Sequence, residues 1–159
     1  MPIKILSDIN VTSNGQFEDL TVKDDLSAVD LFATGAHIKQ ADITFSSYSE
    51  NTMSVDINSY TATLDLSQGN TFTILLTSSI NKFVLNNIPA NTASFTLVIN
   101  QDSINSPKDI DWVFEGQILK WSGGAPQITQ TLSATDIYSF VSFTSGGTWY
   151  GFIGGQDFV

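Results

Sequence analysis

The chain has 159 residues, of which 42% are hydrophobic and 11% aromatic, so it can build a core and a wholly disordered chain is excluded. The net charge is −10 and arginine is absent, which excludes a nucleic-acid partner and argues against an anionic membrane surface, because both require clustered cations. Cysteine is absent, which excludes disulfides and thiolate metal sites, and we expect neither a signal peptide nor a transmembrane run.

Residues 1–58 predict a short-stranded stem or anchor segment. Short apolar–polar alternations are separated by turn-like groups such as 13–15 and 23–25. Four apolar residues follow each other at intervals of six, the rung length of some β-solenoids and fibre stems: Leu20, Leu26, Phe32 and Ile38. An ordinary meander of short strands, or a helical turn or two over 24–34, are alternative interpretations. So small a segment should need a partner, either the C-terminal domain or copies of itself.

Residues 59–159 predict an antiparallel β-sandwich with a jelly-roll-like arrangement. Strands are expected at 60–66, 72–76, 82–85, 94–101, 110–114, 118–121, 136–143 and 149–153. The strand 94–101 becomes apolar on both faces and should be central. A tight connection at 115–116 should join the two strands beside it. About eight strands at spacings of about ten residues are typical of such sandwiches.

The last quarter of the chain predicts the hairpin around which this domain is organised. Its arms, 136–143 and 149–153, are rich in aromatic and β-branched residues, and Gly146 and Gly147 supply the turn between them. Both arms are too apolar for solvent exposure, so we expect the upstream strands to cover them.

Five pieces of the C-terminal domain follow one another in a characteristic order. They are 60–72, 94–102, Lys120-Trp121-Ser122-Gly123-Gly124-Ala125-Pro126, 136–140 and 148–152, with Asp157-Phe158 close behind. In this order they resemble a β-domain that recurs in tailed-bacteriophage fibres and other virion proteins. The resemblance implies a non-enzymatic virion component, usually a trimer, with no shared catalytic residues. A long tail fibre would have a longer stem, so a short fibre, a head or neck appendage or a decoration protein fits better.

Candidate chemical sites are few, and we assign no catalytic, cofactor or metal residue. His37 is the only histidine, and no nucleophile motif accompanies it. In a trimer, three copies of His37 would be able to bind a transition metal on the axis, although an ordinary histidine is the simpler interpretation. Two carboxylate groups suit calcium but lack EF-hand spacing, so we interpret them as solvated turn charges: Asp24, Asp25 and Asp30, and Asp109 with Asp111.

Aromatic residues and loops are the remaining candidates for recognition. Four aromatic side chains are of a kind that stacks on sugars: Trp112, Trp121, Trp149 and Tyr150. Most of them should be core, because aromatic residues in strands usually pack. The loops 102–107 and 122–128 are better candidates for variable contacts, since loops carry recognition on a rigid scaffold.

The sequence therefore predicts a non-enzymatic bacteriophage structural protein of the virion that needs no cofactor. It would be a homotrimeric short fibre or a head, neck or tail appendage that contacts other virion proteins. Residues 1–58 would assemble and anchor it, and 59–159 would form its head. The alternatives are a module that binds a host-surface glycan and a capsid decoration protein that stabilises the shell. An enzyme dependent on His37 is a more distant alternative.

Overall fold

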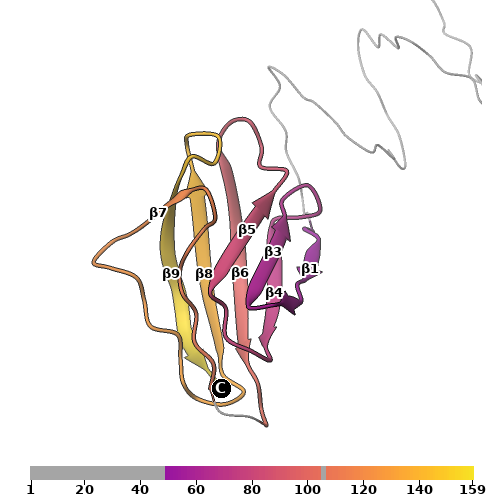
Figure 1. Ribbon diagram of the computed structural model, residues 1–159, viewed down its shortest axis with the longest axis vertical. Helices are drawn as coiled ribbons and strands as arrows, with labels where there is room; N and C mark the ends of the chain where they lie inside the picture. Colours follow the sequence, from indigo (N-terminus) through magenta and orange to yellow (C-terminus); the bar gives the residue numbers. More distant parts are fainter. Residues whose placement is uncertain (1–48, 105–106) are drawn as a thin grey trace, which may run out of the picture. The chain divides into compact units, whose positions relative to one another are not determined.

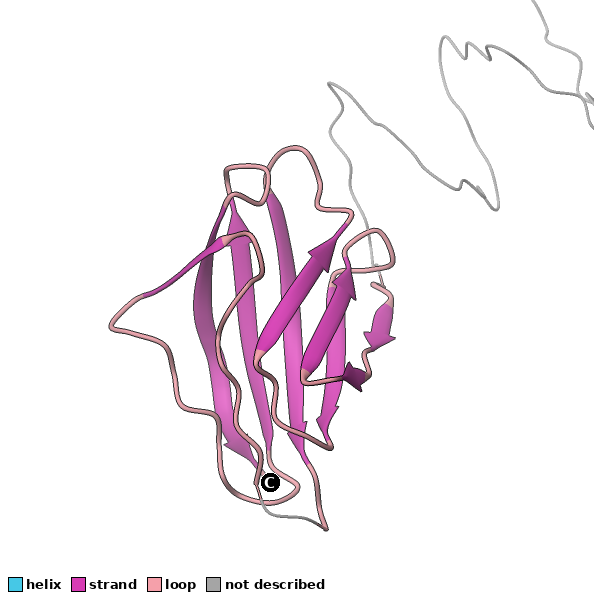
Figure 2. Ribbon diagram, viewed as in Figure 1, coloured by secondary structure: helices cyan, strands magenta, loops and turns pink. Residues whose placement is uncertain are grey.

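Two β-sheets pack face to face in the part of the chain that the computed structural model describes, residues 49–104 and 107–159 (Figure 1). These residues contain no helix (Figure 2). The predicted all-β class is therefore confirmed. Most of the predicted stem, residues 1–48, lies outside the described residues.

The larger sheet, sheet A, has six strands. In spatial order they are β1 (Thr52–Ser54), β4 (Thr71–Leu76), β6 (Ala93–Gln101), β8 (Thr135–Ser142), β9 (Thr148–Phe158) and β7 (Ile118–Trp121). The smaller sheet, sheet B, contains β2 (Ile57–Asn58), β3 (Thr61–Asp65) and β5 (Lys82–Asn86), in this order. The predicted boundary at 58/59 lies inside this sandwich, because β1 pairs with β4 and β2 pairs with β3.

The strands pair in both directions, so the expectation of a purely antiparallel sandwich is wrong. The parallel pairs are β1 with β4, β4 with β6, β7 with β9, and β3 with β5. A parallel pair requires a crossover. Here the chain changes sheet at every step from β3 to β6, so β4 is the crossover between β3 and β5, and β5 is the crossover between β4 and β6.

The segment 110–114 is not the regular strand that was expected there. It is not a strand of sheet A but extends sheet B through single bridges from Ile110 to Ile80 and from Phe114 to Phe83. The tight connection that follows has Gly116 at a φ of 76° and leads to β7 in the other sheet. β7 then pairs with β9 instead of with 110–114.

The C-terminal hairpin forms as predicted, with β8 and β9 antiparallel and side by side (Figure 1). Only one face of it is covered, which corrects the expectation that neither arm faces solvent. Tyr138, Phe140 and Trp149 are buried, whereas Tyr150 and Phe152 on the opposite side of the same sheet are exposed. The physical reason is the strand's period of two, which turns every second side chain away from the second sheet.

Aromatic rings form the centre of the core. The Phe95 ring stacks on Phe140 at 4.8 Å between centroids and meets the edge of Trp149 at 5.2 Å. Trp112 closes the core between the sheets, stacked on Phe83 at 5.9 Å. Such pairs add about 0.5–1.5 kcal/mol each beyond the area they bury. The interior of the sandwich is therefore packed and not hollow.

Candidate interaction surface

Strand register decides which side chains sheet A turns away from the core. In β6 every second residue from Ala93 to Gln101 is buried, and the residues between them point outward. Across the strands, Thr96 lies between Thr71 and Ser139, and Ser139 lies beside Phe152. The residues at these outward positions form one continuous surface, the outer face of sheet A. They are Thr52, Ser54, Thr71, Thr73, Leu75, Ser94, Thr96, Val98, Asn100, Ile118, Lys120, Thr135, Ile137, Ser139, Val141, Thr148, Tyr150 and Phe152.

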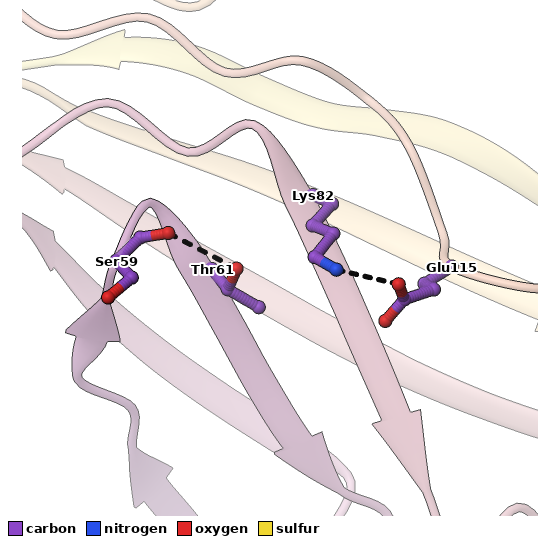
Figure 3. Close-up of polar contacts among 4 residues, drawn as sticks. All are labelled: Ser59, Thr61, Lys82 and Glu115. Carbon is purple, nitrogen blue, oxygen red and sulfur yellow. Dashed lines mark hydrogen bonds and ion pairs between the residues drawn. The ribbon is translucent and has the colours of Figure 1, made fainter.

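The outer face of sheet A carries almost no charge. Lys120, on the edge strand β7, is the single charged side chain among its eighteen described residues. The opposite side of the sandwich is different, because the outward residues of sheet B and its extension include Asp65, Lys82 and Glu115. Lys82 and Glu115 form an ion pair there at 2.6 Å (Figure 3). The two outer faces are thus chemically distinct.

Exposed apolar side chains gather on one half of the outer face, next to β9. This apolar strip consists of Ile118, Phe143, Tyr150 and Phe152. Phe143 directly follows β8, and its ring lies 6.2 Å from that of Tyr150. The exposed fractions are 58% for Ile118, 67% for Phe143 and 54% for Phe152. Exposed apolar side chains that gather on one face, instead of being scattered singly, indicate an interaction site.

A shallow depression of about 320 Å³ adjoins the apolar strip. Its lining includes the hydroxyl side chains of Ser94, Thr96 and Ser139 and the ring of Phe152. Asn70, which precedes β4, and Glu50, which precedes β1, complete the polar part of the lining. Hydroxyl, amide and carboxylate groups beside an exposed ring are chemically suited to a polar ligand that also has an apolar face.

A buried polar cluster lies at the other end of β8, centred on Asp136. Its carboxylate accepts hydrogen bonds from the backbone N–H groups of Thr129 and Asp157, at 2.8 and 2.9 Å. The Tyr138 hydroxyl donates at 2.9 Å, and the Gln156 amide bridges Asp136 and Tyr138. Because these groups satisfy one another, the cluster holds the loop before β8 and the end of β9 in place.

The electrostatics of this cluster follow from its hydrogen bonds. Burial by itself would raise the pKa of Asp136, but the hydrogen bonds from Thr129, Asp157 and Tyr138 together outweigh burial and hold this pKa below its usual 3.8. Burial, followed by the hydrogen bond to Asp136 and its negative charge, raises the pKa of Tyr138 well above 10.0. The carboxylate is therefore ionised and the phenol neutral at neutral pH.

The sequence candidates for metal binding and catalysis do not meet at a site in the described part of the chain. His37 and the group Asp24, Asp25 and Asp30 lie outside the described residues. The residues 49–104 and 107–159 contain no group of three or more histidines and carboxylates that would hold a metal ion. The Asp109 carboxylate instead accepts a hydrogen bond from the Gln130 amide at 3.1 Å.

The four aromatic candidates for sugar stacking do not form a platform. Trp149 is completely buried, and Trp112 and Trp121 are partly buried and packed on the core, with their rings 5.0 Å apart. Tyr150 alone of the four lies on the outer face of sheet A. The loop 122–128 is tied to the sandwich, since the carbonyl oxygen of Pro126 accepts a hydrogen bond from the Trp112 indole at 2.8 Å.

Sequence reasoning missed the outer face of sheet A as a candidate site. The signal was present in the outward positions of β4, β6 and β8 and in those of β9 from Thr148 to Phe152, none of which is charged in a chain of net charge −10. Recognising it requires knowing that these four strands are neighbours in one sheet. Local sequence patterns do not reveal that β4 and β6 are neighbours, because they pair in parallel and β5 lies between them in the chain.

Comparison of the chain with protein-family models, with curated proteins and with solved structures finds no match in any of the three. Among the described residues, no helix is long and apolar enough to span a membrane.

Proposed function

We propose that this protein is a non-enzymatic structural component of a bacteriophage virion, a short homotrimeric fibre or a head, neck or tail appendage. The single observation that carries this proposal is the outer face of sheet A, which is partly aromatic and has Lys120 as its single charged side chain among the described residues, in an otherwise acidic chain. A surface of this kind suits a lasting contact with another protein.

The pieces of sequence that resemble virion β-domains support the same proposal. They coincide with strands of the sandwich, from β3 and β4 through β6 and β8 to β9, and with the loop that follows β7. Closed cyclic oligomers are a common solution for chains that must bury an exposed face against copies of themselves. The chain that precedes β1 would then link the sandwich to other virion proteins.

Sedimentation equilibrium of the purified full-length protein tests the oligomeric part of this proposal. We expect a mass three times that of the single chain. Antibodies raised against the protein should also label intact particles in electron micrographs. A monomer at every concentration, together with unlabelled particles, would contradict the fibre or appendage role.

Binding of a host-surface glycan is a second candidate function, and the depression beside Phe152 favours it. Aromatic rings stack on the apolar faces of sugars while hydroxyl, amide and carboxylate groups bind their polar edges. A glycan array probed with the wild type and with Phe152→Ala tests this function. Signal that is lost in Phe152→Ala but kept in Val113→Ala would support it.

A decoration role makes a different prediction. Particles that lack the protein would then lose infectivity at a lower temperature than wild-type particles but would adsorb to cells normally. An adsorption defect without a change in heat stability would favour the appendage or the glycan-binding role.

A further inference from the structure

We propose that copies of this chain pack against one another through the outer face of sheet A, with the apolar strip at the centre of the contact. The inference rests on the proposed homotrimer and assigns its interface, which neither the sequence resemblance nor the oligomeric state defines.

Charge is the first argument that a second copy covers this face. Two copies of a chain with net charge −10 repel each other over most of their surface. The outer face of sheet A is where this repulsion is least, because none of its eighteen described residues is acidic and the carboxylate of Glu50 lies only at its edge, in the depression beside Phe152. By contrast, the outer side of sheet B would bring Asp65, Asp111 and Glu115 of one copy towards those of another.

Size is the second argument. Stable interfaces use about 20–30 residues from each partner. The outer face contributes eighteen outward residues, and Phe143 and Phe158, 67% and 52% exposed, lie at its margins. One face of one sheet is therefore just large enough for a stable contact between two copies, and in a trimer each copy would share it between two neighbours.

The arrangement of side chains within the face is the third argument. Interfaces typically have an apolar, aromatic centre and a polar rim. The apolar strip lies on β9 and β7 and just beyond the end of β8, whereas the half formed by β1, β4 and β6 is mostly threonine and serine. A symmetry axis that passes beside β9 would bring the strips of all copies together and leave the hydroxyl-bearing half at the periphery.

Two matched substitutions in the full-length chain test the interface. Phe152→Glu places a carboxylate in the apolar strip, and Val113→Glu places one at a residue of similar exposure, 50%, beside sheet B. We expect Phe152→Glu to weaken self-association at least 100-fold in sedimentation equilibrium and Val113→Glu to leave it within about threefold. Unchanged circular dichroism and unfolding midpoints would show that both variants are folded.

The outcomes separate this inference from the proposed trimer. If the wild type is a trimer and Phe152→Glu dissociates it, the result supports both the trimer and the interface. If the wild type is a dimer and Phe152→Glu dissociates it, the result supports the interface but overturns the trimer. A trimer that withstands Phe152→Glu keeps the trimer and overturns the interface. A wild-type monomer overturns both.

Thiol labelling gives a readout that does not depend on dissociation. The chain has no cysteine, so single substitutions are unique probes. Ile118→Cys lies in the apolar strip and Thr63→Cys on the outer side of sheet B, and both native residues are exposed. In the oligomer we expect Ile118→Cys to react at least tenfold more slowly with a maleimide than Thr63→Cys. Equal rates in a confirmed oligomer would overturn the interface.

Discussion

At the scale of single residues, Gly151 shows how closely β7 and β9 approach. A Cβ atom at this position would lie 2.6–2.7 Å from the ring atoms of Trp121. We expect Gly151→Ala to lower the free energy of unfolding by about 1–3 kcal/mol, because the indole would have to move within a packed core. Urea unfolding measures this change.

Gly147→Ala is the matched control for this substitution. The nearest atom to a Cβ there is the Thr144 carbonyl oxygen at 3.4 Å, an ordinary contact. The control should therefore lose clearly less stability than Gly151→Ala. Equal losses would mean that contact with the Trp121 ring is not the cause.

Asp136 makes stability depend on pH in a predictable direction. Its pKa in the folded protein lies below 3.8, so the unfolded chain binds the proton first as the pH falls. The stabilisation by the carboxylate is therefore complete at neutral pH, begins to decrease below about pH 4 and is lost once the pH passes the folded pKa.

Asp136→Asn should lower the free energy of unfolding by about 1–3 kcal/mol at pH 7. The Thr129 and Asp157 N–H groups donate to different oxygens of the carboxylate, and in asparagine one of these oxygens is replaced by an NH₂ group, which would face one of the two donors. The difference from wild type should shrink as the pH falls towards 2. Denaturant unfolding across this pH range measures it, with the exposed Asp56→Asn as control. A difference that is constant with pH would contradict the assignment.

The sequence predicts the strands that contain these residues but not the surroundings of their side chains. It predicted a strand at Asp136 but gave no reason for a buried carboxylate there. The partners of Asp136 come from the loop before β8 and from the end of β9, and hydrogen bonds between distant segments leave no local pattern. It likewise assigned Tyr60 to the apolar side of a strand, whereas Tyr60 is exposed at a φ of 60°.

At the scale of elements, the turn between β2 and β3 is built from residues that do not favour it. Ser59 and Tyr60 both have positive φ, at 50° and 60°, between the paired residues Asn58 and Thr61. Figure 3 shows the Thr61 hydroxyl donating to the Ser59 carbonyl across this turn, at 3.4 Å. A two-residue turn with two positive φ angles prefers Asn-Gly.

The double substitution Ser59→Asn with Tyr60→Gly should therefore raise the free energy of unfolding by about 1 kcal/mol, since glycine removes the left-handed strain at the second position. Thermal and denaturant unfolding measure this gain. Tyr60→Ala removes the exposed ring but keeps a Cβ, so it should give no comparable gain. If Tyr60→Ala stabilised the protein equally, the ring and not the backbone would be responsible.

Most strands follow from the sequence, but their partners do not. Alternation locates β3, β4, β5, β6 and β8, because a half-buried strand must repeat with a period of two. The same alternation does not distinguish a neighbour in the same sheet from one in the facing sheet. The segment 110–114 illustrates this, since its apolar residues fit either sheet and it extends sheet B.

At the scale of the whole molecule, the charge distribution predicts how self-association responds to salt. Salt screens the repulsion between acidic copies and has little effect on a contact that carries almost no charge. The association constant should therefore rise between about 0.02 and 0.5 M NaCl in sedimentation equilibrium. A contact made through ion pairs would weaken over the same range, and that result would contradict the assigned interface.

The alternation of the chain between the two sheets also bears on how the molecule reaches its folded state. Since β3, β4, β5 and β6 go to opposite sheets in turn, neither sheet is a continuous piece of chain, and pairing β3 with β5 or β4 with β6 requires closing a loop that contains a strand of the other sheet. Pairings between such distant strands put folding on the slower, millisecond-to-second scale. During that interval unpaired strand edges are open to wrong partners. The acidic surface then has a second benefit, since mutual repulsion keeps unfinished chains apart until the one weakly charged face is complete.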